Sequence, residues 1–179
     1  MTKAPILFGI ENPLLDISAV VPTELLSKYN LKPNDAILAQ PEHLNIYKEL
    51  EQYDCVYIAG GAAQNTMRGA QWMMPPNSTV YVGAVGRDKN ADILKLAAEK
   101  DGLRTEYQIT DLPTGRCAVL ITGKHRSMVT DLQAANAFSL SHLEDPKIWD
   151  LVENAKFYYI GGYFLTVCPQ AVSFINKRP

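Results

Sequence analysis

Residues 55–65 read CVYIAGGAAQN, an apolar run that ends in two glycines and leads into a helix-forming segment. The run Cys55–Ala59 is too short for a helix and predicts a buried strand. Residues 62–74 contain strong helix formers, with no breaker except Gly69, before two prolines stop the helix. The stretch therefore predicts a buried strand that turns directly into a helix, as in parallel sheets covered by helices.

Strands and helices alternate along most of the chain. Short apolar runs predict further buried strands at residues 5–10, 79–84 and 156–160. Alternation with helices of about 10–15 residues is typical of parallel βαβ units and predicts a three-layer α/β core. Residues 16–39 and 104–132 break this pattern with short runs typical of antiparallel strands. We therefore expect residues 1–179 to form one domain, or part of one, with a small β excursion made from these two insertions.

The composition excludes several classes of protein. Hydrophobic residues make up 47% of the 179 and charged residues 20%, which suits a packed core and argues against disorder. The net charge is -2 and no long basic run occurs, so we expect no nucleic-acid or membrane partner. The longest apolar stretch, residues 157–168, contains two glycines and falls short of the ~20 residues that span a bilayer. Three widely spaced cysteines suggest reduced thiols in a cytoplasmic protein, with nuclear entry left open.

Gly60 and Gly61 are the first candidate site. Backbone N–H groups at a helix start, with no side chains to block approach, can form a polar cradle where open α/β sheets bind ligands. A plain strand-to-helix turn that needs glycine for a positive φ explains the pair equally well. The string is neither a P-loop nor a dinucleotide-binding fingerprint, so both alternatives stay open on local evidence.

Asn12 and Asp16, in the string ENPLLD at residues 11–16, are the second candidate site. They follow the first predicted strand, and Pro13 fixes a turn between them. A carboxylate and an amide suit a ribose here, because vicinal hydroxyls can donate together to one carboxylate. Turn capping is the simpler explanation, since Asn before Pro commonly opens a turn. A further strand-to-helix turn, GAVGRD at residues 83–88, predicts only a helix cap by Asp88.

The predicted hairpin around residues 123–126 supplies the remaining candidates. Arg126 sits at its tip, where a guanidinium can reach a phosphate, although most exposed arginines do not. Met128, Thr130 and Leu132 alternate onto one strand face, which can cover a flat base or simply face the core. The three histidines lack carboxylate or cysteine neighbours at ligand spacing, so the sequence predicts no metal site.

Six strings, in this order and at this spacing, resemble the adenosine kinases of the PfkB (ribokinase-type) carbohydrate kinase family. They are GIENPLLDIS, LKPNDAIL, AGGAAQNTMRGAQW, PTGRCAVLITGKHRS, VTDLQAAN and YYIGGYFLTVCP. The resemblance covers residues 6–172 and implies the N-terminal half of a ribokinase-like α/β core, with the two β insertions forming a lid. It also implies transfer of the ATP γ-phosphate to the 5′-hydroxyl of adenosine in purine salvage, with Mg²⁺, by a protein that is monomeric at full length.

The same resemblance implies roles for individual residues. The ribose is held by Asn12 and Asp16, the sugar cradle is formed by Gly60, Gly61 and Asn65, and Arg126 lies near the transferred phosphate. The wall around the base is formed by Ile37, Leu38, Cys117, Met128, Thr130, Leu132 and Tyr163. Three departures from some relatives do not exclude adenosine: they are at Ala36, Ala62 and residues 90–91.

The family's second half carries a DTNGAGD-like stretch, which provides an anion hole and the general base, and most residues that bind ATP and Mg²⁺. No such stretch occurs in these 179 residues. Because phosphoryl transfer depends on positioning and on charge stabilisation at the γ-phosphate, we expect no catalytic residue here and an inactive chain when it is alone. Two alternatives are a noncatalytic nucleoside-binding remnant and another sugar or nucleoside kinase of the same family.

Overall fold

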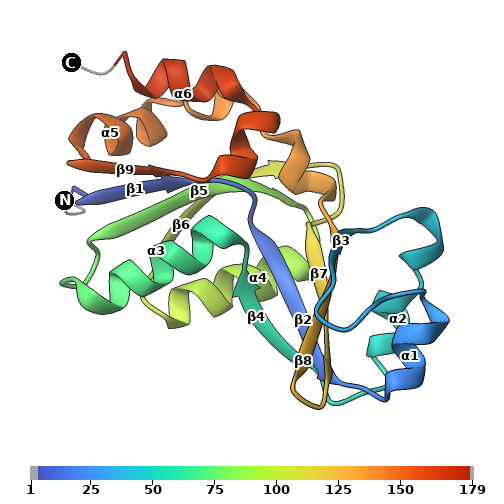
Figure 1. The fold of residues 1–179 in the computed structure, drawn as a ribbon. Helices are drawn as coiled ribbons and strands as arrows, with labels where there is room; N and C mark the ends of the chain where they lie inside the picture. The colour runs from blue at the N-terminus through green and yellow to red at the C-terminus, as the bar shows by residue number, and fades with distance from the viewer. Residues whose placement is uncertain (1–3, 178–179) are drawn as a thin grey trace.

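A sheet of four parallel strands forms the centre of the computed structural model, which describes residues 4–177 (Figure 1). Its strand order is β6-β5-β1-β9. The strands are β1 (Leu7–Ile10), β5 (Thr79–Gly86), β6 (Arg104–Thr110) and β9 (Phe157–Ile160). Every residue of β5 is buried, as expected of a parallel strand covered on both faces.

Helices cover both faces of this first sheet. Figure 1 shows α3 and α4 on one face and α5 and α6 on the other. These helices are α3 (Ala62–Met73), α4 (Lys89–Lys100), α5 (Pro146–Asn154) and α6 (Pro169–Ile175). Successive residues of β1 face opposite layers: Phe8 and Ile10 pack into the cluster that holds α5 and α6, whereas Gly9 lies against Met67 of α3. The predicted three-layer α/β core is confirmed.

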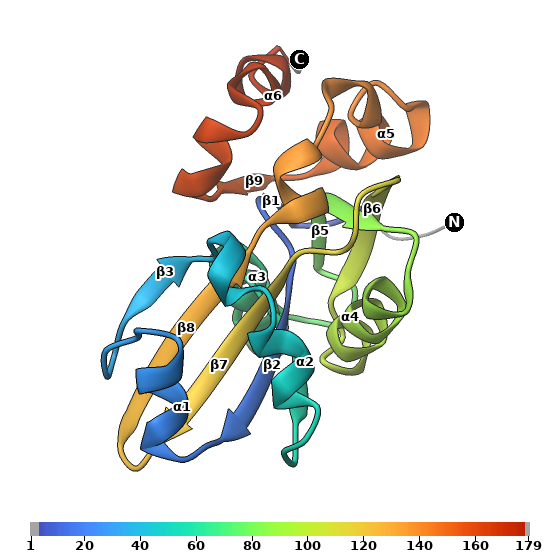
Figure 2. The ribbon, with the colours of Figure 1, turned by 90° about the vertical axis from the view of Figure 1, so that its right-hand side faces the viewer.

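A second sheet of five strands stands beside the first, in the order β3-β8-β7-β2-β4. Its strands are β2 (Leu14–Val20), β3 (Ala36–Leu38), β4 (Val56–Gly60), β7 (Arg116–Thr122) and β8 (His125–Asp131). Helices α1 (Thr23–Lys28) and α2 (Ile46–Leu50) lie against one of its faces (Figure 2), where Leu15 packs in one cluster with Leu26 and Leu50. The opposite face carries exposed apolar side chains, among them Leu38 and Val56.

Short 3-10 helices complete the connections: η1 (Pro41–His43), η2 (Gln133–Ala137), η3 (Leu140–His142) and η4 (Gly162–Thr166). The predicted cap of α4 is confirmed, because the Asp88 Oδ1 accepts a hydrogen bond from the Ala91 N–H at 2.9 Å. Within residues 4–177, no helix combines the length and the apolar character needed to cross a membrane.

The second sheet is assembled differently from the sequence prediction. The run at residues 55–59 does give a strand, β4, but it pairs antiparallel with β2 in the second sheet, and its first three residues are exposed. Residues 104–110, predicted as part of the second insertion, form β6, which pairs parallel with β5 in the first sheet. Both predictions of placement are wrong, because the length of an apolar run does not determine the strand with which it pairs.

Strand β9 was also expected to be buried, and this holds for one face only. Tyr158 and Ile160 pack into the cluster beneath α5 and α6. Phe157 is 64% exposed on the other face. The difference follows from the position of β9 at the edge of the sheet, beyond the cover of α3 and α4 (Figure 1).

Gln71 joins the end of α3 to the start of β5. Its Oε1 accepts hydrogen bonds from the Ser78 N–H at 3.1 Å and the Thr79 N–H at 3.0 Å, and its Nε2 donates to the Pro75 carbonyl at 3.0 Å. The side chain is buried. One amide therefore satisfies three backbone groups at a turn shielded from water.

We expect Gln71→Ala to lower the free energy of unfolding by about 3 kcal/mol, because it leaves buried backbone groups without partners. Urea denaturation followed by circular dichroism measures the change. The exposed Gln52 provides a matched control, and Gln52→Ala should change stability by less than ~0.5 kcal/mol. Equal effects of the two substitutions would contradict the importance of this bridge.

Candidate functional site

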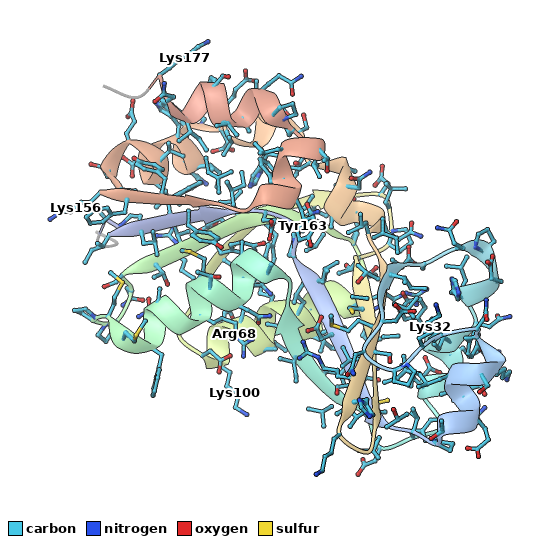
Figure 3. All side chains as sticks on the ribbon, viewed as in Figure 1. Lys32, Arg68, Lys100, Lys156, Tyr163 and Lys177 are labelled. Atoms are coloured by element: carbon cyan, nitrogen blue, oxygen red, sulfur yellow. The ribbon has the colours of Figure 1, made fainter. Side chains whose placement is uncertain are left out.

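The candidate site lies where the chain passes from the first sheet to the second. Strand β1 ends at Ile10, and β2 begins at Leu14 in the other sheet. The short crossing segment, residues 11–13, contains Asn12 and is followed by Asp16 in β2. Figure 3 shows Tyr163 at this junction, and Arg68 on α3 on the side toward the second sheet.

Gly60 and Gly61 differ in what they contribute. A Cβ at Gly60 would collide with the Asp16 carboxylate, so this carboxylate lies directly over the Gly60 backbone. Gly61 has a φ of 93°, which L-residues with side chains rarely adopt. A Cβ there would also lie 2.5 Å from the Asn12 carbonyl oxygen. The turn explanation therefore applies to Gly61, whereas Gly60 makes room for a carboxylate.

Asp16 is half-buried and has no hydrogen-bond donor of its own among residues 4–177. Burial raises its pKa to about 6, and the charges of Arg126 and Arg68 oppose that rise. An ionised carboxylate in such a place is costly unless donors are supplied. The geometry leaves these acceptor oxygens available for a ligand.

A row of side chains crosses the second sheet at the level of Asp16. In register, Asp16 pairs with Cys117, Cys117 with Thr130, and Thr130 with Leu38, so the four share one face. The Thr130 hydroxyl lies 3.4 Å from the Cys117 sulfur. Burial raises the pKa of Cys117 to about 11, which keeps this thiol neutral near pH 7. Met128 lies on the same face of the sheet, two residues before Thr130 in β8.

Two predicted members of the base wall do not belong to this row. Ile37 pairs with Val129, and both pack into the core on the opposite face of the sheet. The physical reason is the period of two in a strand, which puts neighbouring Ile37 and Leu38 on opposite faces. Leu132 lies one residue beyond β8 with helical backbone angles, so the alternation that linked it to Thr130 ends before it.

The remaining predicted residues surround the junction. Asn12 is 6% exposed, and its side-chain Oδ1 has no hydrogen-bond partner in the described part of the chain. Asn65 is on the first turn of α3, where its Oδ1 accepts from the Arg68 Nη1 at 2.8 Å. Tyr163 projects into solvent, with 72% of its surface exposed.

Arg126 begins the face of β8 that carries Met128 and Thr130. Its backbone N–H donates to the Asn34 Oδ1 at 3.2 Å. Its guanidinium forms no ion pair within residues 4–177, and its charge acts on Asp16. The guanidinium is therefore free to bind an anion that approaches this face.

Two charged residues of the junction were not predicted from the sequence. Arg68 bridges α3, β4 and the end of α4: it donates to the Ala59 carbonyl at 2.5 Å and pairs with Asp101. Glu11 is 2% exposed and accepts hydrogen bonds from two backbone N–H groups. The only sequence signal for Glu11 was its position, since it is a charged residue directly after an apolar strand.

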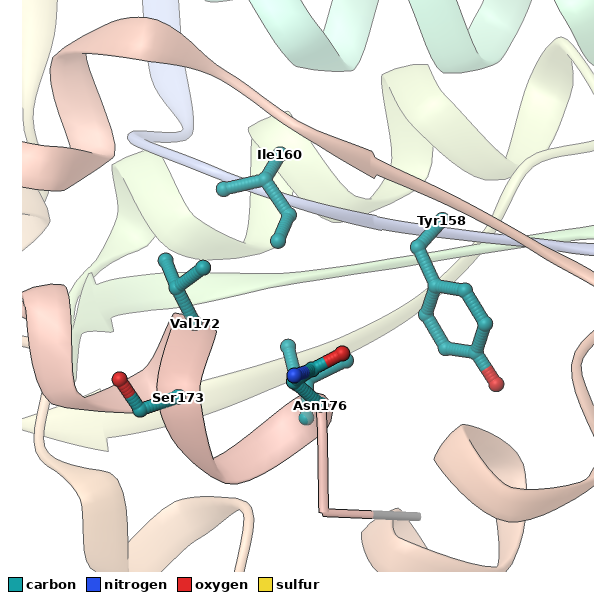
Figure 4. Close-up of a pocket in the computed structure, with 6 residues that line it drawn as sticks. Tyr158, Ile160, Val172, Ser173 and Asn176 are labelled. Carbon is teal, nitrogen blue, oxygen red and sulfur yellow. The ribbon is translucent and has the colours of Figure 1, made fainter. Parts of the chain in front are cut away.

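Two hollows of the fold lie away from this row. A cavity of about 280 Å³ is on the α6 side of β9, lined by Tyr158, Ile160, Val172, Ser173, Ile175 and Asn176 (Figure 4). Another lies on the opposite face of the second sheet from the Asp16 row, and Ile37 and His43 are among the residues that line it. Neither is lined by Asp16 or by the residues of its row. The candidate site is the face of the second sheet that carries Asp16 and its row, beside the junction, and its members range from the buried Cys117 to the exposed Leu38.

Comparison with known proteins agrees with this architecture. Residues 23–174 match the model of the pfkB family carbohydrate kinases. Adenosine kinase 2 of Arabidopsis thaliana is 46% identical over 176 residues, which cover 97% of this chain and 51% of the plant protein. Adenosine kinase of Schizosaccharomyces pombe is 51% identical over 171 residues, which cover 93% of this chain and 49% of the yeast protein.

Solved structures of similar proteins show the same fold. Anopheles gambiae adenosine kinase, in complex with P1,P4-di(adenosine-5) tetraphosphate, superimposes with a TM-score of 0.89 at 43% identity, over 98% of this chain and 53% of that one. Schistosoma mansoni adenosine kinase in complex with tubercidin gives a TM-score of 0.88 at 40% identity, over 99% and 53%. The chain spans about half the length of the relatives it matches. It has the ribokinase-like α/β fold and belongs to the PfkB family of carbohydrate kinases.

Proposed function

We propose that this chain is the acceptor-binding part of an adenosine kinase, which transfers the γ-phosphoryl group of ATP to the 5′-hydroxyl of adenosine. The observation that carries the proposal is the Asp16 carboxylate, held over Gly60 without a hydrogen-bond donor of its own. Relatives named adenosine kinase at 46% and 51% identity support it. The use of ATP follows from membership of a kinase family.

The proposed ribose site consists of Asp16 and Asn12. Two vicinal hydroxyls can donate to the two oxygens of one carboxylate, which satisfies the acceptors that the fold leaves free. Asn12, whose backbone carbonyl lies against Gly61, also has a buried Oδ1 without a hydrogen-bond partner within residues 4–177. Gly60, Gly61 and Asn65 form the rest of the sugar cradle in this proposal.

The proposed base site is the exposed face of the second sheet. Leu38, Met128, Thr130 and Cys117 provide a largely apolar surface next to Asp16, and Tyr163 borders it at the junction. A flat purine would remove this surface from water. Arg126, free of an ion pair in the described residues, would neutralise charge at the phosphate.

The described residues form no site that would enclose a metal ion with protein ligands alone. Within residues 4–177, no three His, Cys, Asp or Glu side chains gather in a way that could hold a metal ion. Mg²⁺ commonly binds through one or two carboxylates together with substrate phosphates, so in this proposal the ion that the family implies would be held largely by the nucleotide. In this proposal the chain holds and orients the acceptor, and the 179 residues alone do not transfer phosphate.

Calorimetric titration with a panel of ligands tests the proposal. We expect adenosine to bind, and 2′-deoxyadenosine and 3′-deoxyadenosine to bind about tenfold more weakly, because each lacks one donor to Asp16. Binding of ribose in preference to adenosine would favour a sugar kinase instead. Formation of AMP from ATP and adenosine by the 179 residues alone would contradict the assignment of acceptor binding only.

Asp16→Asn should separate stability from binding. The folded pKa of Asp16 is raised from 3.8 to about 6, so the wild-type protein loses stability as pH rises through this window. The Asp16→Asn variant cannot ionise at this position, so it does not lose stability in this way. We therefore expect it to melt above the wild type at pH 8 and to match it near pH 4, while adenosine binds about 100-fold more weakly because two hydroxyls lose a charged acceptor. Differential scanning calorimetry and titration measure the two effects, and a lower melting temperature at pH 8 would contradict the explanation.

Adenosine affinity should also depend on pH. With a pKa of about 6, Asp16 is mostly ionised at pH 7.5, and roughly a tenth is ionised at pH 5. Since only the ionised form accepts both hydroxyls, the affinity should fall about tenfold between these pH values. Asp16→Asn should abolish this dependence. An unchanged slope in the variant would assign the titration to another group.

A further inference from the structure

Two helices at the junction of the sheets begin directly after a glycine. Gly61 precedes α3 and Gly161 precedes η4, and neither N-cap provides a side-chain hydrogen bond. The first N–H groups of a helix have no partners within the helix, so another group must satisfy them when they are buried.

Glu11 supplies both missing partners. Its Oε2 accepts from the Ala63 N–H at 2.8 Å, and its Oε1 accepts from the Tyr163 N–H at 3.2 Å. The side chain is almost completely buried. A negative charge at the N-terminus of α3 is also favoured by the helix dipole. One carboxylate therefore joins the segments that follow β1, β4 and β9.

Gly161 shows that this arrangement is built into the fold. Its φ of -67° is open to any residue, so its backbone conformation does not require glycine. A Cβ at this position would instead collide with the carboxylate of Glu11. The glycine thus provides the space that the Glu11 side chain occupies.

We propose that Glu11 is a positioning residue of the nucleoside site, an inference that rests on the proposed function. Each of its three attachment points adjoins a residue of that site. Asn12 follows Glu11 directly, Gly61 precedes the helix that Ala63 anchors, and Tyr163 is itself held through its N–H. The carboxylate sets the distance between these groups without touching the ligand.

Glu11→Gln tests this role with almost no change in shape. A glutamine amide nitrogen cannot accept, so one of the two backbone N–H groups loses its partner. In the protein expressed at the full length that its gene encodes, calorimetry should show the adenosine dissociation constant rising about tenfold, because the site residues beside the released N–H group are no longer held at their spacing before the ligand binds. Thermal melting of the same samples measures stability.

Gln71→Ala is the matched control. Gln71 also bridges buried backbone N–H groups, but at the far end of α3. It should lower the melting temperature at least as much as Glu11→Gln while leaving the dissociation constant for adenosine at the wild-type value. This pattern separates positioning of the site from general loss of stability.

Gly161→Ala provides a second, independent test. With Glu11 present, the added Cβ displaces the carboxylate, so adenosine binding should weaken about as much as in Glu11→Gln. In the Glu11→Gly background, Gly161→Ala should weaken binding no further, because the collision has been removed. Such non-additivity identifies direct coupling between the two positions.

Two results would overturn the proposal. One is wild-type adenosine affinity in Glu11→Gln together with a lower melting temperature, which would leave Glu11 a purely structural role. The other is additive effects of the Glu11 and Gly161 substitutions. If the wild-type protein itself bound no adenosine, the proposed function would fail, and this inference would fail with it. That outcome is seen in the wild type, whereas the two results above are seen only in the variants.

Discussion

The constraint on which the site depends is the close packing of backbone around residues 11–16, where the chain crosses between the sheets. Gly61 lies against the Asn12 carbonyl, and a Cβ at Gly83 would collide with the Glu11 carbonyl and with Pro13. Gly60 leaves room for Asp16 in the same way. Glycine at these positions lets the end of β4 and the middle of β5 approach the crossing segment closely, so that groups distant in sequence meet there.

This packing determines what the second sheet can present. Since β2 continues directly from the crossing, Asp16 stands at the junction, and the register of β7, β8 and β3 aligns Cys117, Thr130 and Leu38 beside it. The opposite face of the sheet is fixed to α1 and α2 by a core that includes Leu15. One face is thus needed for folding and the other remains free to contact a ligand.

The sequence predicted the local elements better than their partners. Helix α3 and the Asp88 cap follow from propensity and capping, which act within a few residues. The placement of β4 and β6 depends on contacts between distant segments, which the apolar character of a short run does not determine. The resemblance named Ile37 together with its neighbour Leu38 for the base wall, but only every second residue of a strand faces the same way, and Ile37 packs toward the core. Glu11 escaped prediction because its partners are backbone N–H groups far along the chain.

Two carboxylates five residues apart illustrate how environment separates structure from function. Glu11 is buried but satisfied, since two backbone N–H groups donate to its oxygens. Asp16 is less buried but unsatisfied, and burial without donors raises its pKa to about 6. A satisfied carboxylate has little to gain from a ligand, whereas an unsatisfied one gains each hydrogen bond that the ligand brings. In the proposed ribose site, the burial that makes the Asp16 carboxylate costly to the empty fold is therefore the cost that the hydroxyl donors of a ligand would offset.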